Sequence, residues 1–118
     1  MLVGAEVEKV YLACGSTDMR KSIDGLAAIV QVSFSLDPFS TCFFVFCNKN
    51  RNKLKILHWQ QNGFWLYYRR LEKGNFQWPK HSNSYPLEVG IRELGWLLDG
   101  LSLEQKKAHP KVDSKSVI

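Results

Sequence analysis

The dipeptide Asn62-Gly63 separates two runs of apolar and aromatic residues, and this pattern constrains the fold more than any other feature of the chain. Asn-Gly is the strongest short-range signal for a β-hairpin with a two-residue loop, because both residues tolerate the positive φ angles of such loops. With these two residues as the loop, Lys55 faces Arg70 across the hairpin. The sequence therefore predicts two antiparallel strands whose register decides which side chains share a face.

The other elements are predicted from the spacing of apolar residues. In the first helical pattern, Ser16, Thr17 and Asp18 offer N-caps. In the second, Gly100 is placed as a C-terminal stop. The expected strands are 8–13, 40–48, 53–59, 64–71 and 75–79, and the expected helices are 16–31 and a second one between Ile91 and Gly100.

Taken in order, these elements predict an α+β fold. We expect an antiparallel β meander of four to five strands, with an N-terminal helix between strands one and two and a C-terminal helix packed on the sheet. The length of 118 residues fits one domain, expected over residues 1–108, with residues 109–118 as a flexible tail.

The composition favours a reduced protein of the cytoplasm. Cys14, Cys42 and Cys47 are odd in number and form no C-x-x-C pair, so neither a disulfide framework nor a zinc site is expected. No signal stretch and no apolar run of about 20 residues is present, so we expect a cytoplasmic protein without a membrane partner.

Positive charge is gathered in one third of the chain. The net charge is +5, whereas residues 47–80 alone carry eight cations and one anion, a local +7. Such segregation favours a polyanionic partner, although basic loops are also common on ordinary solvated surfaces.

The hairpin register sorts the strand residues onto two faces. An expected core face holds Phe44, Phe46, Leu54, Ile56, Trp65, Tyr67 and Leu71. The second face is basic at one end and aromatic at the other, and holds Lys53, Lys55, Leu57, Trp59, Leu66, Tyr68 and Arg70. Opposed Lys55 and Arg70 would repel by up to about 1 kcal/mol, which an anionic ligand would relieve.

Basic and aromatic sheet faces bind nucleic acids, so this second face is a candidate interface. Two other interpretations stay open. Glu72, expected opposite Lys53, neutralises part of the cluster within the protein, or Trp59 and Tyr68 lie under one of the helices.

The chain carries no recognisable catalytic motif. Enzymes that cut DNA with two metal ions need clustered carboxylates, and the acidic residues show no such arrangement. His58, His81 and His109 lack metal-ligand spacing, and the P-loop, nucleophile-elbow and H-E-x-x-H motifs are absent. We therefore expect no catalysis, no metal, no cofactor and no small-molecule substrate.

The strings VYLACGSTDMRKSIDGLAAIVQ, FVFCNKNRNKLKILHW, GFWLYYRRLEKGNFQWP and LLDG follow one another in this chain. In combination they resemble the short accessory protein, called TnpB or Orf2, that bacterial insertion-sequence 66 (IS66) elements encode beside their transposase. The resemblance runs from Lys9 to Pro79 and resumes at residues 97–100. It implies an auxiliary factor in transposition, with DNA as the suspected ligand and no known catalytic residue.

The resemblance also implies which cations matter. Positions where the family is typically basic are occupied here by Arg20, Lys21, Lys49, Arg51, Lys55 and Arg70. The chain departs from the family pattern at Cys47, Asn50 and Gln60, where relatives often carry an arginine, a basic loop residue and an aspartate. Fewer cations imply weaker phosphate contacts.

Two hypotheses follow from the sequence. In the first, a non-catalytic transposition factor contacts DNA phosphates, with Trp59 or Tyr68 as stacking groups. Its predicted nucleic-acid-binding residues are Arg20, Lys21, Lys49, Arg51, Lys53, Lys55, Trp59, Tyr68 and Arg70. In the second, a protein-protein adaptor docks on the transposase of the same element through Trp59, Leu66 and Tyr68, without binding nucleic acid.

Overall fold

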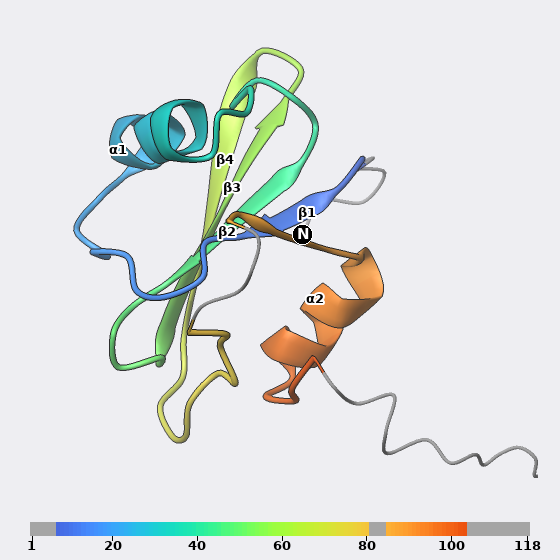
Figure 1. The fold of residues 1–118 in the computed structure, drawn as a ribbon. Coiled ribbons are helices and arrows are strands. Elements are labelled where there is room, and N and C mark those ends of the chain that lie inside the picture. The colour runs from blue at the N-terminus through green and yellow to red at the C-terminus, as the bar shows by residue number, and fades with distance from the viewer. Residues whose placement is uncertain (1–6, 81–84, 104–118) are drawn as a thin grey trace, which may run out of the picture.

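A five-stranded sheet forms the centre of the computed structural model, which describes residues 7–80 and 85–103. The strands lie in the order β4-β3-β2-β1-β5 (Figure 1). Their bounds are β1 Val10–Leu12, β2 Phe43–Cys47, β3 Lys53–Gln60, β4 Gly63–Arg70 and β5 Leu87–Val89. Every residue of β2 is buried, as expected for an apolar strand that is covered on both faces.

The predicted antiparallel meander is correct for β2, β3 and β4 and wrong for β1. Strand β1 pairs with β2 in parallel, with Tyr11 opposite Phe44, and pairs with β5 antiparallel. The sheet is therefore mixed. The reason lies in the connection between β1 and β2, because a helical crossover returns the chain to start the next strand in the same direction.

The helices follow the predicted order with shorter bounds. Helix α1 (Ile23–Ala28) continues as a π-helical turn, η1 (Ile29–Ser33), and both lie between β1 and β2 in the chain. The helix starts later than predicted, because residues 17–21 form a turn instead. Helix α2 (Ile91–Leu98) ends before Gly100, whose φ of 83° confirms it as the stop.

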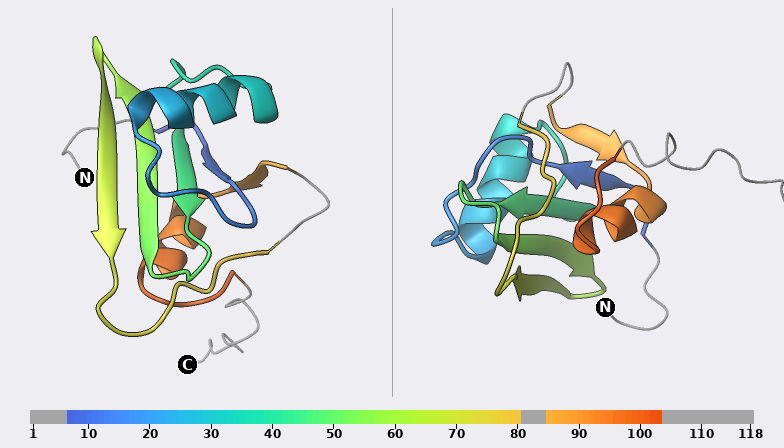
Figure 2. Two further views of the ribbon diagram at one scale, coloured as in Figure 1. Left: turned by 90° about the vertical axis from the view of Figure 1, so that its left-hand side faces the viewer. Right: turned by 90° about the horizontal axis from the view of Figure 1, so that it is seen from below.

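The two helices cover opposite faces of the sheet, and the right-hand view of Figure 2 shows the three layers. Residues Leu26, Val30 and Phe34 from the α1 side pack on Phe44 and its neighbours. On the other face, Leu94 and Leu97 of α2 pack on a second cluster of buried residues. Because β2 and β3 lie between these clusters, their side chains fill both cores.

The strand predicted at residues 75–79 is wrong, and the short β5, which sequence analysis did not predict, occupies a sheet edge instead. The segment 75–79 has no regular secondary structure, and its Phe76 and Trp78 are buried in the α2-side core. The Phe76 amide donates to the carbonyl oxygen of Arg51 at 2.7 Å, and Trp78 Nε1 donates to that of Ala13 at 3.0 Å. The segment thus packs as a strap across the ends of the strands.

The strap predicts a stability difference between two neighbouring residues. Phe76→Ala removes a side chain that is 1 % exposed and should lower the free energy of unfolding by about 3–5 kcal/mol. Gln77→Ala, at an exposed position of the same segment, should change it by less than about 0.5 kcal/mol. Urea denaturation measures both, and similar values for the two variants would contradict the packing of the strap.

Candidate nucleic-acid interface

The β3–β4 hairpin has a different loop from the predicted one. Gln60 pairs with Gly63, so Gln61 and Asn62 form the loop, and Gln61 takes the positive φ of 47°. Each residue of one strand therefore meets a partner two positions away from the predicted one, and the alternation of the hairpin faces is unchanged.

Aromatic pairing explains why this register prevails over the Asn-Gly turn signal. Trp59 lies opposite Phe64 with ring centroids 4.9 Å apart, and Trp65 Nε1 donates to Gln60 Oε1 at 3.1 Å. Cross-strand aromatic pairs contribute up to about 1 kcal/mol each. These contacts hold the loop one residue before the predicted position.

The predicted core face is wrong for Phe44 and Phe46. Phe44 lies opposite Leu57 and Phe46 opposite Lys55, so both phenylalanines share the face of the lysines rather than that of Leu54 and Ile56. The five-residue connection from β2 to β3 shifts the alternation by one residue relative to the predicted register. The basic face is therefore partly covered, since α1 and η1 pack on these phenylalanines.

The turn at residues 17–21 forms a wall beside the uncovered part of that face. The Thr17 amide donates to the carbonyl oxygen of Cys47 at 2.8 Å, and the Lys21 amide to that of Asp18 at 3.1 Å. Lys55 Nζ donates to the carbonyl oxygens of Met19 and Lys21, both at 2.8 Å. The Lys55 ammonium thus anchors the turn to the hairpin.

A groove lies between this turn and the hairpin. Its volume is about 570 Å³, and it is lined by Asp18, Met19, Arg20, Lys53, Lys55, Leu66 and Tyr68. Tyr68 is 54 % exposed, and Lys55 Nζ lies 5.9 Å from the centroid of its ring. The groove therefore combines an aromatic and apolar surface with cations at its margin.

Arg20 and Asp18 form an ion pair within the turn. Arg20 Nη2 lies 2.7 Å from Asp18 Oδ2, and Nε is 3.1 Å from both carboxylate oxygens. Hydrogen bonds from the Arg20 side chain and its backbone amide lower the pKa of Asp18 to about 2. Asp18 is therefore not the helix cap that its position suggested, but the partner that orients Arg20.

Lys53 and Arg70 face each other across the strands, in place of the predicted Lys55 and Arg70. Like charges in this arrangement destabilise the sheet. Glu72 pairs with Arg70 at 2.9 Å rather than with Lys53, and this contact raises the pKa of Arg70. Among the described residues, the Lys53 ammonium makes no hydrogen bond or ion pair.

The loop at residues 48–52 brings two more predicted cations to the same end of the hairpin. Asn48 Oδ1 accepts hydrogen bonds from the amides of Asn52 and Lys53 at 3.0 Å, which fixes the loop. Lys49 is exposed and Arg51 is half-buried, with a φ of 61°. We call the set Arg20, Lys49, Arg51, Lys53 and Arg70 the basic end.

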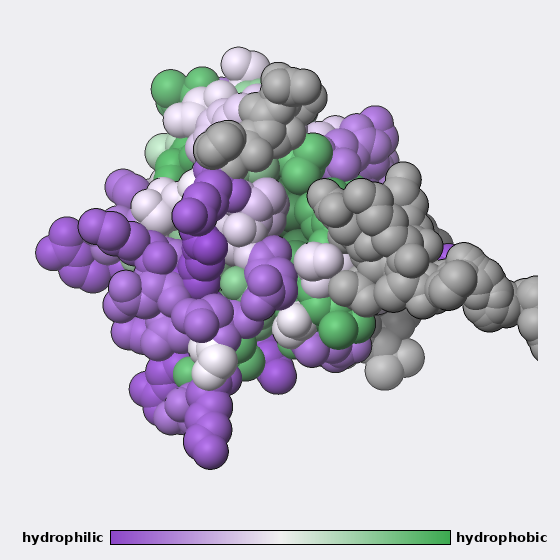
Figure 3. All heavy atoms as spheres, turned by 60° about the horizontal axis from the view of Figure 1, so that its bottom comes forward, coloured by the Kyte–Doolittle hydropathy of each residue, from purple (hydrophilic) through white to green (hydrophobic). Residues whose placement is uncertain are grey.

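Hydrophilic side chains cover much of this side of the molecule, at the left and bottom of the view in Figure 3. This is the side on which the turn 17–21 and the loop 48–52 lie in Figure 1. Lys21 is also exposed on this side, but its side chain passes close to Gly25, where an added Cβ would lie 3.3 Å from it. Of the predicted cations, Arg20, Lys53 and Lys55 therefore line the groove, Lys49, Arg51 and Arg70 lie at the same end of the hairpin, and Lys21 is directed along α1.

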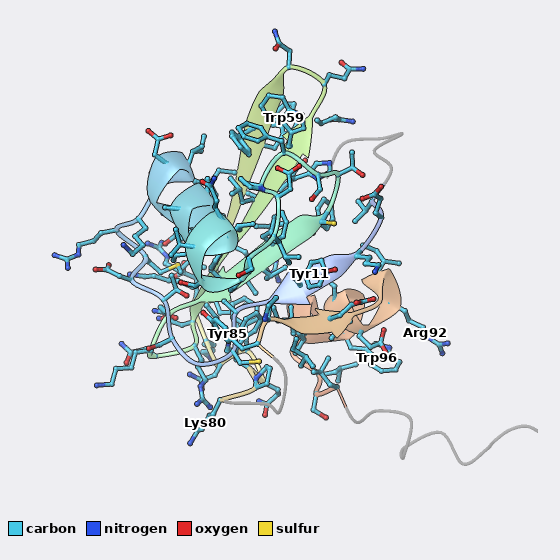
Figure 4. All side chains as sticks on the ribbon, turned by 45° about the horizontal axis from the view of Figure 1, so that its top comes forward. Tyr11, Trp59, Lys80, Tyr85, Arg92 and Trp96 are labelled. Carbon is cyan, nitrogen blue, oxygen red and sulfur yellow. The ribbon has the colours of Figure 1, made fainter. Side chains whose placement is uncertain are left out.

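Trp59 lies near the hairpin loop (Figure 4), whereas Lys53 and Arg70 lie at the other end of the hairpin. Its ring makes edge contacts with Phe39 and Phe64, each at 4.9 Å between centroids. Trp59 is four positions along β3 from Lys55, which lies opposite Tyr68, and this is a span of ~13 Å. We call Phe39, Trp59 and Phe64 the aromatic tip.

Sequence analysis missed the contributions of Asp18, Met19 and Phe39. Asp18 and Met19 belong to a pattern that predicted a helix, and only the short spacing of Asp18 and Arg20 signals an ion pair. Phe39 follows the chain break at Pro38 and carries no signal in the sequence for its contact with Trp59.

Within residues 7–80 and 85–103, no three histidine, cysteine or acidic side chains gather in a way that would hold a metal ion. In the same part of the chain, no helix has the length and apolar character needed to cross a membrane.

Comparison with known proteins shows the family to which the sequence belongs. The model of the IS66 Orf2-like protein family matches residues 8–108. The chain belongs to the IS66 Orf2-like family. Two uncharacterized proteins of Sinorhizobium fredii are similar to it: y4hO, 32 % identical over 86 % of this chain and 87 % of its own length, and y4jC, 28 % identical over 86 % of each. No solved structure matches the chain.

The anchoring role of Lys55 predicts that its substitution lowers stability more than substitution of Lys53, two residues earlier on the same face of β3. Lys55→Met removes two hydrogen bonds from a charged donor and should lower the free energy of unfolding by about 1–3 kcal/mol. Lys53→Met should change it by less than about 0.5 kcal/mol, because the Lys53 ammonium has no such partner. Urea denaturation measures the stability, and faster amide exchange at the 17–21 turn in Lys55→Met alone would confirm the cause.

The ion pair in the turn predicts the titration of Asp18. Carbon-detected NMR should give this carboxyl a pKa of about 2, and Arg20→Ala should raise it while leaving it below the usual ~3.9, since the backbone amide still donates. Because the pKa is lower in the folded state, the stabilising contribution is present above about pH 4 and is lost as the pH falls through about 2. An unchanged pKa in Arg20→Ala would contradict the assignment.

Proposed function

We propose that this protein is a non-catalytic accessory factor for transposition of an insertion element, and that it contacts DNA through the basic end. Membership of the IS66 Orf2-like family supports the role in an insertion element. The observation that carries the DNA contact is the placement of these cations at one end of the hairpin. Arg20 and Lys53 line one open groove, Arg70 lies directly opposite Lys53, and Lys49 and Arg51 lie in the loop before β3.

Phosphate groups are the ligands that suit this arrangement. The cations come from three segments, the 17–21 turn, the 48–52 loop and the hairpin, so they spread along a surface rather than converge on one point. Cations spread along a surface in this way can follow a phosphate backbone and supply affinity that is independent of sequence. Neither helix of the described chain presents a row of Arg, Asn or Gln side chains, so base reading by a helix in the major groove is not part of the proposal.

A salt series tests the DNA contact. Fluorescence anisotropy with labelled duplex DNA should give an affinity that falls as the salt concentration rises, with a slope set by the number of phosphates contacted. Lys49→Gln and Lys53→Gln should each reduce that slope by about 0.9. Arg92→Gln, which removes a cation from α2 on the opposite side of the sheet, is the matched control and should leave the slope unchanged. No binding at low salt, or equal effects of all three changes, would refute the proposal.

The aromatic tip favours a second candidate function, docking on the transposase of the same element. Phe39 is 56 % exposed although it contacts Trp59 and Phe64, and exposed aromatic side chains of this kind anchor protein interfaces. The anchor proposed from the sequence, Trp59 with Leu66 and Tyr68, is split by the structure, because Leu66 and Tyr68 line the groove.

Pulldown of the purified transposase separates the two candidates. As an adaptor, the protein should lose the transposase on Phe39→Ser and retain it on Lys53→Gln. As a DNA-binding factor, it should lose affinity for DNA on Lys53→Gln and retain it on Phe39→Ser.

A further inference from the structure

The groove beside the 17–21 turn has features that phosphate binding does not use. Phosphate contacts need exposed cations alone, yet this groove is lined by an exposed tyrosine ring, Leu66 and Met19. Its volume of about 570 Å³ lies within the range of pockets that hold small organic groups. A flat, partly apolar group that belongs to a polyanion would fit such a groove.

Tyr68 has the properties of a stacking surface. Its ring is more than half exposed, at 54 %, although it belongs to strand β4 and lies beside the anchored Lys55. Two carbonyl oxygens hold the Lys55 ammonium, so the position of this cation beside the Tyr68 ring is already fixed in the free protein. Bases of single strands stack on exposed aromatic rings of this kind, with little dependence on sequence.

The polar groups at the margin suit the edge of a base and the phosphates beside it. Arg20 uses Nε and Nη2 for Asp18, and among the described residues its Nη1 makes no hydrogen bond. The Asp18 carboxylate is an acceptor for the exocyclic amino group of a base. Lys53 and Arg70 lie next to the groove as partners for the flanking phosphates.

A base pair within a duplex does not meet these conditions. Its faces are covered by the neighbouring base pairs, so neither face is free to stack on the Tyr68 ring. Only a base that has left the stack presents both a free face and a free edge. We therefore propose that the groove binds one unpaired nucleobase, stacked on Tyr68, and that the protein binds single-stranded DNA more tightly than duplex DNA of the same sequence. This inference rests on the proposed DNA contact.

Anisotropy titrations with a labelled single-stranded oligonucleotide and its duplex test the inference at one salt concentration. Tyr68→Leu should weaken binding to the single strand by roughly 5- to 150-fold, the loss expected for one stacked base, and change duplex binding by less than about twofold. Tyr68→Phe keeps the ring and should retain the single-strand affinity. The matched control is Trp65→Leu, which removes a 43 % exposed ring from the opposite face of the same strand and should leave the single-strand affinity unchanged.

The outcomes separate this inference from the DNA contact itself. Equal weakening of single-strand and duplex binding by Tyr68→Leu, or an equal effect of Trp65→Leu, would overturn the nucleobase site while leaving the phosphate contacts standing. Failure of the wild-type protein to bind either DNA at low salt would overturn both.

A measurement on the wild-type protein does not depend on how the variants fold. Photocrosslinking with a single strand that carries 5-iodouracil should attach the base to the peptide that contains Tyr68, because this base crosslinks to stacked aromatic rings. Attachment at Trp59 or Trp65 instead would overturn the proposed site.

Discussion

The burial of β2 on both faces is the constraint on which the rest of the structure depends. Five consecutive apolar residues, Phe43–Cys47, cannot meet solvent on either side of a sheet, so a layer must cover each face. The crossover from β1 supplies the layer on one side, and α2 with the strap at residues 75–79 supplies the other. Because the crossover must span the sheet before it enters β2, its first segment, the turn at 17–21, is brought beside the β3–β4 hairpin.

Lys55 then fixes the turn at residues 17–21 to the hairpin, and the groove lies between them. A lysine opposite the buried Phe46 has its aliphatic part in an apolar layer and its ammonium at the margin, where water is partly excluded. The carbonyl oxygens of Met19 and Lys21 satisfy the ammonium, and in doing so hold the turn at a fixed distance from Tyr68. The Lys55 ammonium thus has a structural role, and its predicted contact with nucleic acid stays a prediction.

The sequence predicts the elements of this fold better than their contacts. The apolar run of β2, the aromatic strands of the hairpin and the helix stop at Gly100 are local signals, and they predicted these elements correctly. The hairpin register depended on the pairing of Trp59 with Phe64, which a turn signal does not contain. Strand β5 has only three residues, and its extended conformation depends on pairing with β1. Its sequence therefore has too few alternating positions to predict a strand.

The same distinction applies to the candidate site. Composition predicted that cations gather between residues 47 and 80, and the structure brings Arg20 to them from a segment far away in the chain. Neither the fixed role of Lys55 nor the separation of Trp59 from Tyr68 was predictable, because both result from tertiary contacts with residues 19–21 and 39.

The charges around the groove fall into two classes that suit reversible binding of a polyanion. Lys55 is held by backbone carbonyls and cannot leave without loosening the turn. Arg20 and Arg70 are paired with Asp18 and Glu72 at the surface, where an ion pair contributes little to stability and weakens with salt. Exchange of such a carboxylate for a phosphate costs little free energy. In the free protein Glu72 therefore reduces the repulsion between Lys53 and Arg70, and both of these cations are still available to a ligand. A fixed cation that shapes the groove and exchangeable cations at its margin together make a surface that is stable when empty and suits the polyanion that we propose as its ligand.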